Sequence, residues 1–418
     1  MLHTLTVDYH HLPARQGYMV RALLELQGVA RTEASRIPLR LALVLDRSGS
    51  MAGEPLEAAT RAAADLVRRL APDDVVSVVA FDDQVRTVLR PHSGADGTGA
   101  IDRILAIQPG GCTNLSGGWL RGRELASKEM QEGALHRVLL LTDGHANAGI
   151  TDPAELAALV AESRRKGVST SCVGFGEGYD EPLLRALADA GGGNLFHIER
   201  PDQSALAFGD ELAGLQTLAG QNVEVTVSLD PAVTIARVHH DWPHTDSAEG
   251  RTFELGDLYA REPKRLLLEF FCEAVPDATL VRALARLTVR ADEREADGGM
   301  AHITTELTVA ATLDGAGQEA PVITREVLLS QAAQARTEAA AMVRRGEGRD
   351  ASRKLREVHR VLESAPPMLN LAADVKDLEA LAAKLERDSG DEMDARYLMQ
   401  KAYNSRRSKR KYDSGFSR

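Results

Sequence analysis

A regular alternation of apolar strands and amphipathic helices between residues 38 and 218 is the feature that most constrains the fold. Residues 39–46 are apolar almost throughout, and apolar side chains then recur at helical spacing from Leu56 to Leu70. Similar strand and helix segments alternate as far as a closing helix over residues 204–218. This order predicts an α/β fold, with a doubly wound, mostly parallel, Rossmann-like sheet covered by helices on both faces.

Oxygen-bearing side chains follow two of these strands directly. Asp46, Ser48 and Ser50 stand at alternate positions where the first strand ends, Thr113 lies in a glycine-rich loop, and Asp143 ends the strand over residues 138–142. Ligands of such sheets bind beyond the carboxyl ends of the strands, where both aspartates are expected. Carboxylate and hydroxyl oxygens suit a hard cation such as Mg²⁺. The five residues therefore predict a metal site, although the first segment alone is also typical of a helix N-cap.

In this order of residues the chain resembles the von Willebrand factor A (VWA) domain family with its metal ion-dependent adhesion site (MIDAS). The resemblance covers roughly residues 38–215. It implies that Ser48, Ser50 and Thr113 contact the metal, while Asp46 and Asp143 often act through water. It also implies that a Glu or Asp of a partner protein fills the remaining coordination position. Mg²⁺ is the expected ion, with Mn²⁺ or Ca²⁺ as alternatives.

Four further residues are expected on the rim of this site, where a bound partner would touch them: Arg47, Asn114, Gly144 and His145. For His145 a plain solvent-facing loop position is the alternative interpretation.

The first functional hypothesis is a metal-dependent protein-binding module, acting as an intracellular scaffold or assembly factor and not as an enzyme. The resemblance implies a partner such as an AAA+ ATPase or a signalling protein. The sequence contains no P-loop pattern, so any nucleotide hydrolysis is assigned to the partner.

The second hypothesis is a Mg²⁺-dependent hydrolase of phosphatase type that uses the same strand-end site. Phosphoryl-transfer hydrolases of the haloacid dehalogenase type, which the site resembles in part, need a second Asp where this chain has Ser48. A serine nucleophile in a Gly-x-Ser-x-Gly turn is also disfavoured, because Asp46 replaces the first glycine.

The formal net charge of -11 argues against general nucleic-acid binding, because phosphate contacts need a basic surface. Basic residues cluster only at 406–411, within residues 391–418, which we interpret as a basic, flexible tail. Binding of nucleic acid or of a membrane surface through this tail is the third hypothesis.

No apolar run approaches the ~20 residues of a membrane span, no secretory signal is recognised, and the three cysteines are widely spaced. A cytoplasmic location is therefore expected.

The segments that flank the α/β region have different patterns. Residues 220–330 alternate apolar and polar side chains between turn signals, which predicts an antiparallel β-sandwich whose last strand covers residues 322–328. Residues 1–36 contain two strand-like runs without a sheet of their own, and we expect them to join the sandwich. The VWA-like domain, residues 37–219, would then be an insertion.

Residues 331–390 return to a helical pattern. Two helices separated by a glycine-containing turn are followed by Pro366-Pro367 and by a third helix with an apolar stripe. The stripe is interpreted as a packing face, so this helical segment is expected to dock on the sandwich or on the α/β domain.

Overall fold

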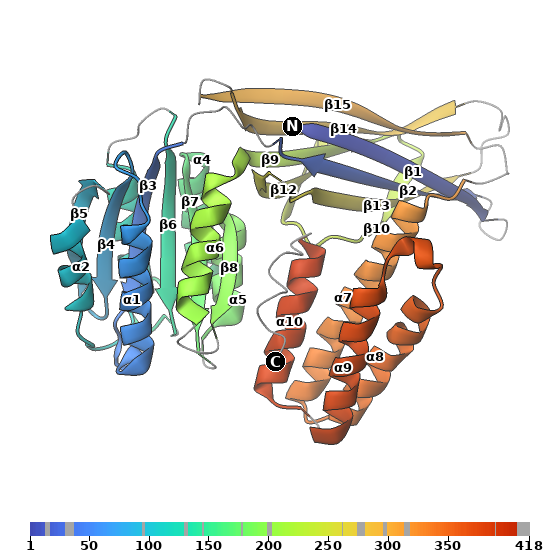
Figure 1. The fold of residues 1–418 in the computed structure, drawn as a ribbon. Coiled ribbons are helices and arrows are strands. Elements are labelled where there is room, and N and C mark those ends of the chain that lie inside the picture. Colours follow the sequence, from blue (N-terminus) through green and yellow to red (C-terminus); the bar gives the residue numbers. More distant parts are fainter. Residues whose placement is uncertain are drawn as a thin grey trace.

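The computed structural model describes residues 1–12, 17–29, 37–93, 97–128, 133–143, 146–176, 179–198, 203–260, 262–273, 281–295, 299–312, 318–388 and 390–407. Figure 1 shows three parts: an α/β domain, a sandwich of two antiparallel sheets, and a helical bundle beneath the sandwich. Among the described residues, no helix combines the length and the apolar character needed to cross a membrane.

The α/β domain contains a six-stranded sheet in the order β5-β4-β3-β6-β7-β8. Its strands are β3 (Leu39–Asp46), β4 (Val75–Phe81), β5 (Val85–Ser93), β6 (Leu135–Thr142), β7 (Val168–Phe175) and β8 (Gly192–Ile198). All neighbouring pairs are parallel except β4 and β5, which are antiparallel. The strand order reverses between β3 and β6, so the crevice expected to bind ligands lies where these two strands end. The doubly wound, mostly parallel sheet is confirmed.

Helices cover both faces of this sheet. They are α1 (Glu54–Arg68), α2 (Gly97–Leu105), α3 (Leu115–Ala126), α4 (Pro153–Arg165), α5 (Glu181–Ala190) and α6 (Ser204–Gln216). Alternate residues of β3 enter different cores: Leu41 and Leu43 pack with α1 and α6, whereas Ala42 and Val44 pack with α3, α4 and α5. Burial on both faces explains why this strand is apolar almost throughout.

The sandwich consists of a four-stranded and a five-stranded antiparallel sheet. The first has the order β1 (Leu2–Leu12), β2 (Gly17–Gln27), β13 (Lys264–Glu273) and β10 (Val233–Val238). The second has the order β11 (His244–Ser247), β12 (Gly250–Tyr259), β9 (Leu218–Leu229), β14 (Val281–Arg294) and β15 (Met300–Thr312). Because β2 pairs with β13 from Gly17 opposite Glu273 to Leu26 opposite Lys264, the N-terminal strands and the later strands form one sheet.

A buried ionic network joins the α/β domain to the sandwich. Arg137 of β6 is 1% exposed and forms an ion pair with Asp257 of β12. Its guanidinium also donates to Ser171 at 2.9 Å and lies 3.5 Å from Glu211. A buried arginine is tolerated only where acceptors surround it, so these contacts fix one domain against the other.

The bundle is built from α7 (Pro321–Arg344), α8 (Gly348–Glu363), the short 3-10 turn η5 (Pro367–Leu369), α9 (Ala372–Asp388) and α10 (Glu392–Arg406). The prediction of a strand over residues 322–328 was wrong, because this segment is the first part of α7. Ile323 and Glu326 are buried on one side of the helix at a spacing of three residues. Tertiary packing of this face against Leu23 and Leu267 overrides the strand propensity of the local sequence.

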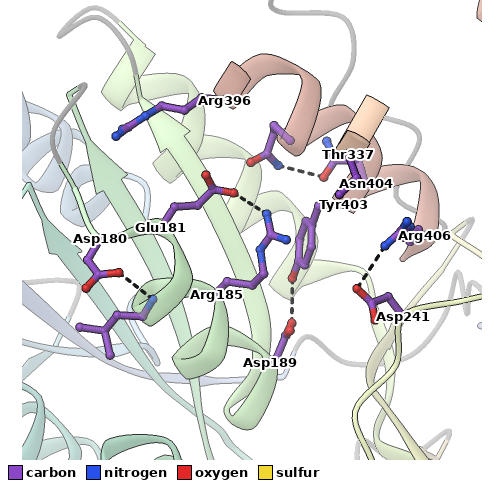
Figure 2. Close-up of polar contacts among 12 residues, drawn as sticks. Asp180, Glu181, Arg185, Asp189, Asp241, Thr337, Arg396, Tyr403, Asn404 and Arg406 are labelled. Carbon is purple, nitrogen blue, oxygen red and sulfur yellow. Dashed lines mark hydrogen bonds and ion pairs between the residues drawn. The ribbon is translucent and has the colours of Figure 1, made fainter. Parts of the chain in front are cut away.

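The prediction of a flexible tail over residues 391–418 was also wrong for its described part. Asp391 and Asp394 form a capping box that starts α10, and Figure 1 shows this helix between α7 and the α/β domain. Tyr403 is 5% exposed and donates to Asp189 of α5 at 2.9 Å, as Figure 2 shows. Arg407 pairs with Asp189 at 2.6 Å and lies over the ring of Trp242, 4.6 Å from its centroid. Residues 408–418 lie outside the described part of the chain.

Candidate metal centre

Asp46 ends β3 with its side chain fully buried, at 0% exposure. One carboxylate oxygen accepts the backbone N–H of Ser48 at 2.8 Å, and the other accepts the hydroxyl of Thr142 at 2.5 Å. The first bond shapes the turn after β3, while the second ties that turn to the end of β6. Asp46 therefore orients the site from inside, a position that suits the water-mediated role implied by the resemblance.

Ser48, Ser50 and Asp143 form a chain of polar contacts that leads from this buried carboxylate to the surface. The hydroxyl oxygens of Ser48 and Ser50 lie 3.2 Å apart, and Ser50 donates to Asp143 at 2.9 Å. Ser48 is 2% exposed, whereas Ser50 is exposed and Asp143 is half-buried. The structure thus brings four of the five predicted residues together at the ends of β3 and β6.

Thr113, the fifth residue, is 3% exposed and lies in a loop that backbone hydrogen bonds join to both neighbouring loops. Its carbonyl accepts the N–H groups of Asn147 and Ala148 at 3.0 and 3.2 Å, in the segment after β6. On the other side, the N–H of Gly49 donates to the carbonyl of Gly111 at 3.0 Å. The three sequence segments of the predicted site therefore meet at one edge of the sheet.

Two of the four predicted rim residues, Arg47 and Asn114, lie in the described part of the chain. The expectation for Arg47 is corrected: it is 8% exposed and forms an ion pair with Asp82 at 2.7 Å, so it faces inward. Asn114 caps α3, because its side-chain oxygen accepts the N–H of Gly117 at 3.0 Å. Gly144 and His145 lie outside the described residues.

Burial acts on both carboxylates of the site. It raises the pKa of Asp46 to about 6, although hydrogen bonds from Thr142 and Ser48 lower it. Burial also raises the pKa of Asp143, and the hydrogen bond from Ser50 opposes this shift. A nearby divalent cation favours the charged form of both groups and would reverse these shifts.

The donor set fits a hard cation. In the described part of the chain, no three His, Cys, Asp or Glu side chains gather into a metal-binding group, so a centre built from imidazole or thiolate is not found there. The ends of β3 and β6 offer instead the hydroxyls of Ser48 and Ser50 and the carboxylates of Asp46 and Asp143, and Thr113 lies in the loop joined to them. Such an all-oxygen set matches the preferences of Mg²⁺, Mn²⁺ and Ca²⁺.

Two residues of the site were missed in the sequence. Thr142, which bonds to Asp46, looks like the last residue of an apolar strand. Asp82 directly follows β4, a third strand that ends at the same edge, and this position was the signal that could have revealed it.

The fold and the site together define an α/β domain with hydroxyl and carboxylate side chains gathered at the ends of β3 and β6. Residues 41–208 match the model of the von Willebrand factor type A domain family. This part of the chain is therefore a VWA domain, as its residues predicted.

Curated relatives match about two fifths to three fifths of this chain. The uncharacterized protein sll0103 of Synechocystis sp. is 31% identical over 247 residues, which are 57% of this chain and 58% of that protein. The uncharacterized protein YfbK of Escherichia coli is 28% identical over 216 residues, 51% of this chain and 38% of that protein. Human inter-alpha-trypsin inhibitor heavy chain H4 is 29% identical over 182 residues, 42% of this chain and 20% of that protein. The matches thus span only part of each relative.

Two solved structures extend the similarity over all three parts of the fold. The structure titled von Willebrand factor type A from Catenulispora acidiphila has a TM-score of 0.72 and 18% identity, and the match covers 96% of each chain. The ArnB paralog VWA2 from Sulfolobus acidocaldarius has a TM-score of 0.59 and 15% identity, with 97% of this chain and 99% of that chain covered. At these identities the likeness shows the shared fold alone.

Proposed function

We propose that this chain is a metal-dependent protein-binding module, which captures a Glu or Asp carboxylate of a partner at a Mg²⁺-loaded MIDAS. In this proposal it works as a scaffold or assembly factor in the cytoplasm. The observation that carries the proposal is the series of polar contacts from Ser48 through Ser50 to Asp143. It begins at a buried strand end and includes the exposed hydroxyl of Ser50.

The chemistry of the donors explains why such a site would attract an acidic group. Ser48, Ser50 and Thr113 would hold the cation with neutral hydroxyl oxygens, whereas the Asp46 carboxylate is already engaged by Thr142 and by the backbone of Ser48. An ion with mostly neutral ligands keeps net positive charge, so an external carboxylate can complete its shell. A protein with a net charge of -11 can in this way present one local positive spot.

The proposed partner is a protein that offers an acidic side chain, for which AAA+ ATPases and signalling proteins are our first candidates. The cytoplasmic location is supported by cysteine usage. Cys112, Cys172 and Cys272 are all free thiols, a state typical of a reducing compartment.

A hydrolase that uses Asp46 or Ser48 as nucleophile is less compatible with this geometry. Both oxygens of Asp46 accept hydrogen bonds, and the two side chains are 0% and 2% exposed, so neither can reach a substrate from this conformation. Phosphatase and esterase screens with Mg²⁺ present test this alternative. Turnover that disappears in Ser48→Ala would overturn the binding-module proposal.

Pull-downs from the native source test the proposal directly, with the full chain as bait. We expect a partner that binds the wild type, is lost on EDTA treatment, and is lost with Asp143→Ala. Asp102→Ala, which removes an exposed carboxylate on α2, is the matched control and should retain the partner. A partner recovered equally in every condition would mean that the metal is not the recognition element.

A further inference from the structure

We propose that the buried ion pair between Arg47 and Asp82 is a positioning device for the metal centre: it holds the Thr113 loop against the Asp46 loop and thereby sets the affinity for the cation. The inference rests on the proposed metal-loaded function. Neither residue is one of the five oxygen donors, so both would act through the loop that they hold.

Arg47 connects three segments of the chain. It stands between Asp46 and Ser48, and its guanidinium forms the ion pair with Asp82 at 2.7 Å. A second guanidinium nitrogen donates to the carbonyl of Gln108 at 3.1 Å, and the Arg47 carbonyl accepts the N–H of Gly110 at 2.7 Å. The side chain that follows the metal-site aspartate is thus anchored to the start of the Thr113 loop.

Asp82 holds the same loop on both sides of Thr113. The oxygen that pairs with Arg47 also accepts the N–H of Gly111 at 3.0 Å, and the Asp82 carbonyl accepts the N–H of Asn114 at 2.9 Å. The other carboxylate oxygen accepts the N–H of Gln84 at 2.9 Å, which fixes the side chain to its own turn. Thr113 therefore lies between Gly111 and Asn114, two residues whose N–H groups donate to Asp82.

The loop backbone lies directly on the ion pair, and Gly110 makes this possible. A Cβ added at Gly110 would stand 1.8 Å from the carboxylate oxygen of Asp82 and 3.2 Å from the guanidinium carbon of Arg47. Any larger residue would have to push the loop away from the pair. The glycine in this loop therefore has a packing reason in addition to its freedom of backbone conformation.

Burial makes the arrangement stiff. Arg47 is 8% and Asp82 is 3% exposed, and a buried charge that loses its partner is strongly destabilised. The loop therefore cannot leave the pair without breaking several charge-assisted hydrogen bonds at once. Residues that orient metal ligands in this way typically contribute about 10–100-fold to metal affinity.

The test compares Arg47→Gln, Asp82→Asn and the double variant with the wild-type full chain. Affinity for Mn²⁺ is measured by calorimetry, and amide hydrogen exchange is followed over residues 108–114. We expect each single variant to bind Mn²⁺ roughly 10–100-fold more weakly and to exchange faster in this loop. The double variant should be little worse than either single one, because both substitutions break the same contact.

The sign of the Arg47→Gln effect separates positioning from simple electrostatics. Loss of a positive charge beside the site would strengthen cation binding if charge alone mattered, whereas loss of positioning weakens it. Arg121→Gln on α3, which removes a guanidinium that donates to Thr87 and Glu124, is the matched control and should leave both readouts unchanged.

Unchanged or tighter Mn²⁺ binding by a folded Arg47→Gln variant would overturn the inference while leaving the proposed function intact. Wild-type protein that does not bind Mn²⁺ at all would overturn the proposed function, and with it the assigned effect on affinity. If the charge variants fail to fold, Gly110→Ala replaces them, since it retains both charges and displaces only the loop. The same weakening is then expected, and its absence would also overturn the inference.

Discussion

The hydrogen bond between Tyr403 and Asp189 attaches α10 to helix α5 of the α/β domain. Tyr403 is buried against α5, and its hydroxyl donates to a carboxylate at 2.9 Å. A hydrogen bond to a charged group contributes about 1.5–3 kcal/mol. Arg407 also pairs with Asp189, at 2.6 Å, so Tyr403→Phe does not leave the carboxylate without a partner. We therefore expect the lower limit of that range, about 1.5 kcal/mol.

The whole ring contributes more than its hydroxyl. Tyr403 packs in the core cluster that α3, α4 and α5 form on the sheet, so Tyr403→Ala should cost about 3–5 kcal/mol, as for other buried aromatic residues. Arg406→Gln is the matched control on the same helix. Its ion pair with Asp241 spans 3.6 Å, and the aspartate is 68% exposed, so we expect a change of at most about 0.5 kcal/mol.

Native-state hydrogen exchange measures these effects, because it reports the local opening of α10 separately from global unfolding. A loss of 1.5 kcal/mol corresponds to roughly tenfold faster exchange of the α10 amides in Tyr403→Phe. Exchange of these amides at unprotected rates in the wild type would refute the reasoning, since α10 would then behave as a frayed tail. Equal effects of Tyr403→Phe and Arg406→Gln would refute the assigned role of the buried hydrogen bond.

Three further predictions follow from the contacts above. Asp257→Asn should lower the free energy of unfolding, measured in urea, by about 3 kcal/mol, because buried Arg137 then loses its nearest carboxylate. Replacement of both residues by apolar ones of similar volume should recover most of that loss. The second prediction concerns the affinity for Mg²⁺, measured by titration at several pH values. It should rise between about pH 5 and pH 7 and then level off, because Asp46 must lose its proton when the cation binds. Burial raises the pKa of this carboxyl to about 6. In metal-free protein the folded state holds this proton more tightly than the unfolded state, with its pKa near 3.8, so thermal stability should instead fall as pH rises through the same group's range, from about 4 to about 6. Asp46→Asn should weaken both dependences, and the part that is left should come from Asp143, whose pKa burial also raises.

Much of the α/β domain could be predicted from the sequence, because its strands are buried on both faces and its helices on one. These two patterns are distinct in the residues themselves, as the continuous run before Asp46 shows. The meeting of Asp46, Ser48, Ser50 and Asp143 could also be expected, since their places after strands reflect the topology of the sheet. Their role as metal ligands stays a prediction.

Contacts between distant segments account for the errors. The start of α7 has the composition of a strand, and only its packing against Leu23 and Leu267 makes it a helix. Arg407, directly after α10, looks solvated until Asp189 and Trp242 supply a carboxylate and an aromatic face. Arg47 likewise looks exposed in a polar loop, because its partner Asp82 comes from the turn after another strand, β4. Such pairings depend on three-dimensional proximity, which local patterns do not contain.

A crystal structure of the full chain grown with Mn²⁺, with anomalous diffraction recorded, tests the central claim most directly. The account predicts one anomalous peak at the ends of β3 and β6, with the hydroxyl oxygens of Ser48, Ser50 and Thr113 in the first coordination shell of the ion. One coordination position should face solvent and hold water or a carboxylate from outside the chain. No peak at this place, or an ion whose coordination shell is closed entirely by atoms of this chain, would contradict the account.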